Sequence, residues 1–495
     1  MSVKSVILTV LAAVAMFLPA ETEAQMPIKV YSRLQLPPDS ADISHYGKEH
    51  FWRAAGEVFG FNIGLWAFDR YVQHGDWAYI NFNTIKENFK HGFKWDNDNL
   101  NTNMFLHPYN GSLYYNAARA NGFNYWKSGL FSIAGSAMWE LFMECEYPST
   151  NDIIATPIGG MCIGEVCFRA SDLVLDDRVG GAERVGREIS GFLLSPMRGV
   201  TRLITGDAWR RRPTSGKIFG LPNIAVELSL GTRMLDYHHD RSHVKFGGAM
   251  ELNVEYGDRF ELKSKKPYDY FTFNASLNFM KTQPVLSHLE IKGRLIGREL
   301  LEEKDCHLSI GLFQHFDFFD SDTISSGLVP YKLGIPASLG GGVFYRDIER
   351  RHWVFDAYAH ANAVILGSVL SDYYMVDDRN YNLASGFSLK GGANMVFDND
   401  RYSFSLSHEY YRLFTWQGYH RNTNLDDADY KTLNAQGDKS VASFNVTQFR
   451  ADMKLCKRLY LTLLLDHYLR STHYRDFPHV KSTTLSAKLM LTYKL

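Results

Sequence analysis

The chain has 495 residues and a formal net charge of −1, with 53 Lys and Arg against 54 Asp and Glu. Because nucleic-acid binding requires a concentrated basic surface, this balance argues against a nucleic-acid partner. The five cysteines are scattered, and Cys162 and Cys167 lack a second ligand pair at zinc spacing. We therefore expect neither a disulfide framework nor a structural zinc, and the sequence predicts no metal and no cofactor.

The N-terminus has the features of an export signal. Lys4 precedes an apolar run from Val6 to Leu18, which is too short to span a bilayer as a mature helix. Small residues up to Ala24 suit cleavage by a signal peptidase. We predict a signal peptide at 1–24, the alternative being a buried helix, and an extended segment at 25–48. No later segment is a run of eighteen uncharged apolar residues, so no conventional helical membrane anchor is expected.

Residues 49–212 are predicted to form a helical domain. Gly56, Gly60 and Gly64 recur at four-residue spacing within an apolar stretch from Phe51 to Val72. Spaced glycines let helices approach closely, as they do in membrane proteins. Close packing inside a soluble bundle explains them equally well, so both interpretations stay open.

The predicted helix at 125–146 carries two acidic residues, Glu140 and Glu144, on one face. A carboxylate pair in apolar surroundings must be neutralised or hydrated. Arg119 and Arg169 are candidates to neutralise it, and a metal site or a proton-handling pair is the alternative.

Several polar residues of the helical domain could form a site if the fold brought them together. A titratable histidine, a serine and carboxylates are the groups that a hydrolytic site needs. The same residues also suit a packed turn at His107-Pro108 and a helix cap at Asn151-Asp152. The candidate catalytic residues are His107, Ser136, Glu140, Asp152 and Glu165. The candidate ligand-binding residues are Tyr114, Arg119 and Glu144.

A specific set of motifs runs through this region. They are His107-Pro108-Tyr109-Asn110-Gly111-Ser112, Tyr114-Tyr115, Trp139-Glu140, Pro148-Ser149, Asn151-Asp152, Gly159-Gly160 and Gly164-Glu165. Over residues 80–200 the chain resembles an uncharacterised, domain-of-unknown-function family of exported proteins associated with the outer membranes of Gram-negative bacteria. The resemblance implies a location and an architecture, and it implies no reaction.

The segment from Asp207 to Gly216 combines three consecutive arginines with Pro213 and is predicted to link the helical domain to the C-terminal half of the chain. Its bases could contact anionic lipid head groups at the periplasmic interface. A solvated linker is the alternative.

From about residue 217 to the end, apolar and polar residues alternate with period two, as in strands with one apolar and one polar face. Ten-residue segments, tight turns at 398–400 and 456–457 and long connections at 319–330, 367–380 and 415–440 favour a transmembrane barrel over a soluble sandwich. The predicted fold is therefore α+β, a helical domain followed by an antiparallel β-barrel of about twelve strands. The strands are predicted at 224–231, 246–256, 271–279, 286–297, 306–318, 334–346, 351–366, 382–397, 401–414, 441–455, 458–470 and 482–495.

Charged residues of both signs are predicted to face the barrel interior, where a water channel, ion pairs or a plug would accommodate them. They are His288, Glu290, Lys292, Arg294, Asp356, His360, His408, Glu409, Arg450, Asp452 and Asp466.

Three functions stay open: a channel that the helical domain plugs or caps, an envelope-lipid hydrolase or transferase with its site in the helical domain, and an outer-membrane scaffold. The expected partners are outer-membrane lipid and periplasmic proteins.

Overall fold

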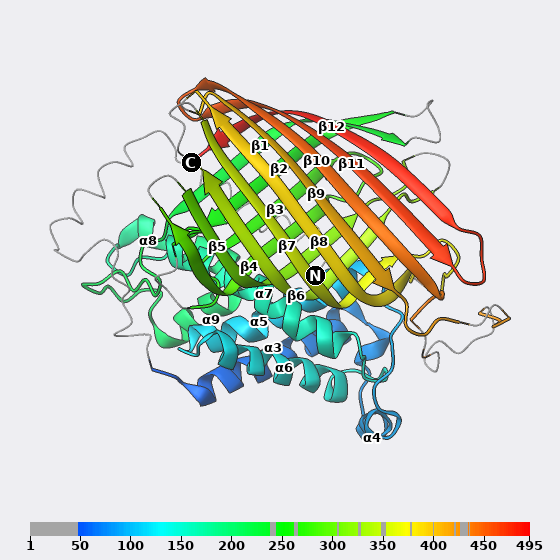
Figure 1. The fold of residues 1–495 in the computed structure, drawn as a ribbon. Coiled ribbons are helices and arrows are strands. Elements are labelled where there is room, and N and C mark those ends of the chain that lie inside the picture. Colours follow the sequence, from blue (N-terminus) through cyan, green and yellow to red (C-terminus); the bar gives the residue numbers. More distant parts are fainter. Residues whose placement is uncertain are drawn as a thin grey trace. The chain divides into compact units, whose positions relative to one another are not determined.

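The computed structural model describes residues 48–237, 244–261, 266–303, 306–324, 328–347, 353–376, 379–398, 400–419, 422–425, 434 and 436–495. The predicted signal peptide at 1–24 and, apart from Lys48, the extended segment at 25–48 lie outside the described residues. The chain divides into two compact units (Figure 1). One holds residues up to 93 and 106–223, and the other holds 94–105 and 224–495.

The first unit is helical. Its α-helices are α3 (Phe51–Phe68), α4 (Phe82–His91), α5 (His107–Ala120), α6 (Tyr125–Phe142), α7 (Asp152–Val174), α8 (Gly181–Leu194) and α9 (Pro196–Thr205). A π-helical turn (Asp69–Gln73) and a 3-10 turn (Asp76–Ala78) come after α3.

Local chemistry explains where these helices start. The Asn81 side chain accepts hydrogen bonds from the backbone of Asn83 and Thr84 and so caps α4. Asn124 caps α6 in the same way, and Pro108 and Pro196 occupy first-turn positions of α5 and α9, where a missing N–H does no harm.

Helices α5 and α7 form the centre of the helical unit, and their contact depends on glycine. A Cβ added to Gly160 would lie 2.4 Å from the carbonyl carbon of Gly111, and one added to Gly111 would lie 1.8 Å from the carbonyl oxygen of Thr156. No side chain fits between the two backbones. The small residues of the family-like motifs are therefore explained by close helix packing.

Helix α7 is long and apolar enough to cross a membrane, with a mean hydropathy of 1.3. Of this stretch, 67% is buried, as it is in the core helix of a soluble protein. Glu165 and Arg169 lie within this helix, so it contains no run of eighteen uncharged apolar residues.

The second unit is a closed antiparallel barrel of twelve described strands, in which each strand pairs with its sequence neighbours and β1 pairs with β12 (Figure 1). This confirms the predicted fold. The strands are β1 (Ile224–Tyr237), β2 (Lys245–Tyr256), β3 (Phe271–Phe279), β4 (Leu286–Glu302), β5 (Cys306–Asp320), β6 (Lys332–Asp347), β7 (Trp353–Leu370), β8 (Tyr381–Phe397), β9 (Tyr402–Phe414), β10 (Ser440–Cys456), β11 (Leu459–Tyr474) and β12 (Val480–Lys494).

Strand β12 shows how the alternation of the sequence becomes two faces. Leu485, Leu489 and Leu491 are exposed, whereas Lys488 and Thr492 are buried. Exposed leucines and buried polar groups are the reverse of a water-soluble sheet and match a barrel whose outer face meets hydrocarbon.

The connections differ in length between the two ends of the barrel. The segments 321–331, 371–380 and 415–439 come after β5, β7 and β9 and therefore lie at one end. The tight connections after β8 and β10 lie at the other end, where β1 begins, together with one long segment, 257–270, after β2. Apart from that segment, the pattern is the asymmetry expected of an outer-membrane barrel.

The segment Lys94–Phe105 belongs to the barrel unit, although residues on both sides of it are helical-unit residues. The Tyr381 hydroxyl donates to the carbonyl of Asp98 at 2.8 Å, and the Phe105 ring lies 5.8 Å from that of Phe318. Phe319 points into the lumen, so its neighbour Phe318 points outward. The segment therefore packs on the outside of β5, at the end of the barrel that carries the long connections.

Candidate functional site

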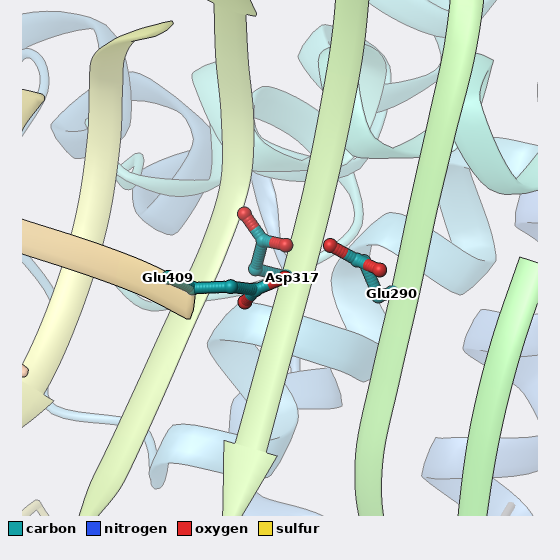
Figure 2. Close-up of side chains that lie close together, drawn as sticks. All are labelled: Glu290, Asp317 and Glu409. Carbon is teal, nitrogen blue, oxygen red and sulfur yellow. The ribbon is translucent and has the colours of Figure 1, made fainter. Parts of the chain in front are cut away.

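The barrel interior holds a cluster of five charged, buried side chains. They are Glu290 and Lys292 on β4, Asp317 on β5, Lys390 on β8 and Glu409 on β9. Figure 2 shows the three carboxyl groups turned toward one another. The ammonium group of Lys390 lies 2.8 Å from Glu290 Oε1 and also bonds to Asp317. Lys292 Nζ lies 2.9 Å from Glu290 Oε1 and 3.9 Å from Glu409 Oε1.

These ion pairs cross the lumen. Strands β4 and β9 are not neighbours in the barrel, and neither are β5 and β8. The contacts of Lys292 with Glu409 and of Lys390 with Asp317 therefore join strands that are five and three positions apart around the barrel. At this level the barrel is closed by its own side chains.

The cluster has the composition of a metal site, because ligand oxygens of Glu290, Asp317 and Glu409 all lie within 4.8 Å of one another. Hard divalent cations prefer such oxygen ligands. However, the ammonium group of Lys390 bonds to two of the three carboxylates and occupies the place a cation would take. The arrangement is therefore best described as an ion-pair cluster.

An aromatic layer closes the lumen next to the cluster. The Phe319 ring on β5 lies 5.4 Å from that of Phe444 on β10, and the Tyr331 ring lies 4.6 Å from that of Tyr468 on β11. Tyr411 on β9 joins the same group. Rings at these distances are in direct contact, so this layer also connects strands that are far apart around the barrel.

A cavity of about 270 Å³ remains inside the barrel. Its wall carries both signs of charge. The charged lining residues are Glu251, Glu290, Lys292, Glu409, Arg450 and Lys488. At about 30 Å³ for each water molecule, it holds roughly nine waters or one small polar solute. All its lining residues come from the barrel strands.

Two buried histidines lie beside the cluster. The rings of His315 and His360 are 5.1 Å apart, and within the described part of the chain none of their four nitrogens has a hydrogen-bond partner. Sequence alternation identified His360 as inward-facing and did not single out His315, which lies two residues before Asp317 on β5.

The sequence prediction was wrong for His408. This residue is exposed, and its neighbour Glu409 is buried inside the barrel. Consecutive residues of a strand face opposite sides, so the two could not both point inward. The alternation also failed to single out Asp317 and Lys390, since nothing in the sequence shows which strands meet across the lumen.

The helical unit brings four of the predicted site residues together at the start of α7. His107 Nε2 lies 3.6 Å from Asp152 Oδ2, and the Ser136 hydroxyl donates to the carbonyl of Asp152 at 3.4 Å. Glu140 Oε2 accepts a hydrogen bond from the backbone N–H of Ser149 at 2.6 Å. The Ser136 hydroxyl is thus bonded to a main-chain oxygen. A nucleophilic serine would instead be hydrogen-bonded to the histidine that activates it.

The other candidates lie elsewhere. Glu165 accepts hydrogen bonds from Arg119, Arg169 and Tyr115 at 2.7 to 2.9 Å and is completely buried, so Arg119 and Arg169 neutralise Glu165. The last two candidates are Tyr114 and Glu144. The Tyr114 hydroxyl donates a hydrogen bond to Asn62 Oδ1, and Glu144 Oε2 accepts one from Trp139 Nε1.

Residues 92–197 match a family model described as a domain of unknown function, DUF3943. No curated protein is detectably similar to the chain.

Among solved structures, the NanC porin aligns with 55% of this chain and 100% of its own at 10% identity and a TM-score of 0.26. The toluene transporter TodX of Pseudomonas putida aligns with 56% and 90% at 8% identity and a TM-score of 0.23. The outer membrane channel DcaP of Acinetobacter baumannii aligns with 55% and 96% at 9% identity and a TM-score of 0.23. At these identities and TM-scores, no solute can be transferred from those proteins to this chain.

Proposed function

We propose that this chain is a channel-type barrel of the bacterial outer membrane, which admits a small polar solute and is closed by its own side chains. The observation that carries this proposal is the lumenal cavity of about 270 Å³ with carboxylates and cationic groups in its wall. A polar lumen with both charges accommodates a hydrated or zwitterionic solute, whereas an apolar one would exclude it.

Closure is attributed to the barrel and not to the helical unit. The contacts of Lys390 and Lys292 and the pair Phe319 and Phe444 join strands that are three to five positions apart around the barrel. All of these residues belong to the barrel strands, so a plug is not required to seal the lumen. The helical domain as a plug or cap is the competing hypothesis.

Conductance in planar bilayers tests the proposal. The full-length protein is expected to conduct weakly, and Phe319→Ala with Phe444→Ala is expected to open the lumen and raise conductance. Phe404→Ala is the matched control, because Phe404 is an exposed ring on the outer face of β9. Full conductance of the unaltered protein would show that the lumen is not closed in this way.

A second function is favoured by the same ion pairs. Cross-lumen salt bridges also suit a non-conducting barrel that anchors a scaffold for periplasmic partners. If the double alanine variant conducts no better than Phe404→Ala, this function replaces the channel.

The enzyme alternative rests on the contact between His107 and Asp152 at 3.6 Å. His107→Ala would abolish a lipid-hydrolase activity of the purified protein, assayed as fatty acid released from phospholipid vesicles. Equal release by His107→Ala and the unaltered protein would exclude a role for this histidine.

A further inference from the structure

Along α3 and α6, several large apolar residues are exposed and several polar residues are buried. On α3, Trp52 is 84% and Phe59 56% exposed, whereas Asn62 is fully buried. On α6, Leu130 is 63% exposed and Ser132 is fully buried. Soluble bundles have the opposite polarity, because apolar surface is driven out of water.

The buried polar groups connect the helices. Asn62 Nδ2 donates to the carbonyl of Gly135 at 3.1 Å, and the Ser132 hydroxyl donates to that of Gly111 at 2.9 Å. Asn121 Nδ2 donates to Glu57 Oε2 at 2.9 Å. Interhelical hydrogen bonds between small and polar residues hold helices together in lipid, where no hydrophobic effect does so.

Charge is absent from the exposed middle of both helices. Beyond the first turn, the charged residues of α3 and α6 are Glu57 and Glu140, and both are buried. Each helix has 18 residues, which corresponds to about 27 Å at 1.5 Å per residue. This length is close to the hydrocarbon thickness of a bilayer, roughly 30 Å.

The two helices are parallel, and their ends carry the residues typical of a membrane interface. At one end, Lys127 pairs with Glu49 at 2.7 Å beside the exposed rings of Trp52 and Trp126. Beyond the other end of α3, the exposed rings of Tyr71 and Tyr79 accompany Arg70, whose guanidinium lies 4.1 Å from the Tyr79 ring centre. Aromatic residues at both limits of an apolar band form the two belts of membrane proteins.

We infer that the exposed face of α3 and α6, centred on Phe59 and Leu130, is embedded in the membrane and contacts phospholipid. This role is independent of whether the barrel conducts.

A basic pocket at the Lys127 end of this face fits the phosphate of a lipid head group. It has a volume of about 220 Å³, and its charged lining residues are Lys48, Arg53, Arg198, Arg202, Arg210 and Asp207. Arg198 and Arg202 are neutralised by Asp172, Asp177 and Glu188, and Asp207 pairs with Arg212. Arg53 interacts with the Glu57 carboxylate. Lys48 and Arg210 have no ion pair among the described residues, so they leave positive charge for a phosphate oxygen to neutralise.

Photo-crosslinking of the full-length protein in phospholipid vesicles tests the lipid contact. The photoreactive residue p-benzoylphenylalanine replaces Phe59 in one variant and Leu130 in another, and the adducts are identified by mass spectrometry. Glu183, an exposed residue of α8, is the matched control position. We expect phospholipid adducts at positions 59 and 130 and none at 183. Adducts with a second copy, with residues 25–47 of the same chain, or no adduct would overturn the inference.

The pocket is tested by titrating the detergent-solubilised protein with dihexanoylphosphatidylglycerol. Arg210→Gln should weaken binding by about tenfold, whereas Arg211→Gln, which removes the neighbouring charge outside the pocket, should leave it unchanged. Equal effects of the two substitutions, or equally tight binding of inorganic phosphate, would overturn the assignment of this pocket to lipid.

Discussion

Lys390 is the residue on which the lumenal cluster depends most. Its ammonium group is fully buried and contacts both Glu290 and Asp317. In Lys390→Met a side chain of similar length fills the space, but two buried carboxylates lose their shared cation. Removing one partner of a buried ion pair costs about 3 to 5 kcal/mol. We expect the free energy of unfolding of the barrel to fall by about this amount.

The measurement is guanidinium unfolding of the protein in detergent micelles, monitored by tryptophan fluorescence and circular dichroism. Lys454→Met is the matched control. The Lys454 side chain is 30% exposed, and its ammonium group lies 3.4 Å from Asp400. Because a solvated ion pair contributes little, this control should lose less than about 1 kcal/mol.

A triple variant separates lost charge from lost packing. Glu290→Gln and Asp317→Asn added to Lys390→Met remove this cation together with its two partners and leave Lys292 paired with Glu409 at 3.9 Å. Replacing a buried ion pair by neutral groups is often close to neutral. The triple variant should therefore regain most of the lost stability. Equal stability of Lys390→Met and Lys454→Met, or a triple variant weaker than the single one, would refute the reasoning.

Three further predictions concern the helical unit and its link to the barrel, each checked by unfolding measurements. Gly111→Ala places a Cβ 1.8 Å from the Thr156 carbonyl oxygen and should cost about 3 kcal/mol, whereas Gly60→Ala meets open space and should cost nothing. Glu165→Gln should cost about 3 to 5 kcal/mol, because Arg119 and Arg169 lose their buried counter-charge, and the exposed Glu183→Gln should change little. Burial lowers the pKa of Lys217 to about 8, against roughly 10.4 when unfolded. Its protonated form is disfavoured in the fold, so stability should rise by up to about 3 kcal/mol from pH 8 to 10.4, and Lys217→Met should abolish that rise.

The strands could be predicted from the sequence because contact with lipid or with the lumen decides whether each strand position is apolar or polar. In β12 the outward positions are mostly leucine and the inward positions, apart from Met490, are polar, so the period of two is visible without any knowledge of the partner strands. The same reasoning gave the tight and long connections.

The lumenal cluster could not be predicted, because it depends on which strands meet across the barrel. Lys390 is an ordinary inward lysine in the sequence, and only the closure of the barrel brings it to Asp317. The segment Lys94–Phe105 has no strand pattern and could not be assigned to the barrel, since its contacts are with residues more than 200 positions away.

For the helical domain, the spaced glycines left two interpretations open, and both depend on close helix packing. Gly111 and Gly160 lie in the tight contact between α5 and α7, whereas Gly56, Gly60 and Gly64 have no atom within reach of an added Cβ. The structure therefore shows close packing at Gly111 and Gly160, and neither interpretation accounts for the three glycines of α3.

Both units have buried polar residues next to exposed apolar ones. In the barrel Lys488 is buried while Leu489 is exposed, and in the helical unit Asn62 is buried while Phe59 is exposed. Helices and barrels are the two structures that satisfy their backbone in hydrocarbon. One solvent accounts for both surfaces, and a periplasmic helical unit would require a separate cover for every exposed aromatic ring of α3. The membrane is thus the more economical explanation for the whole chain.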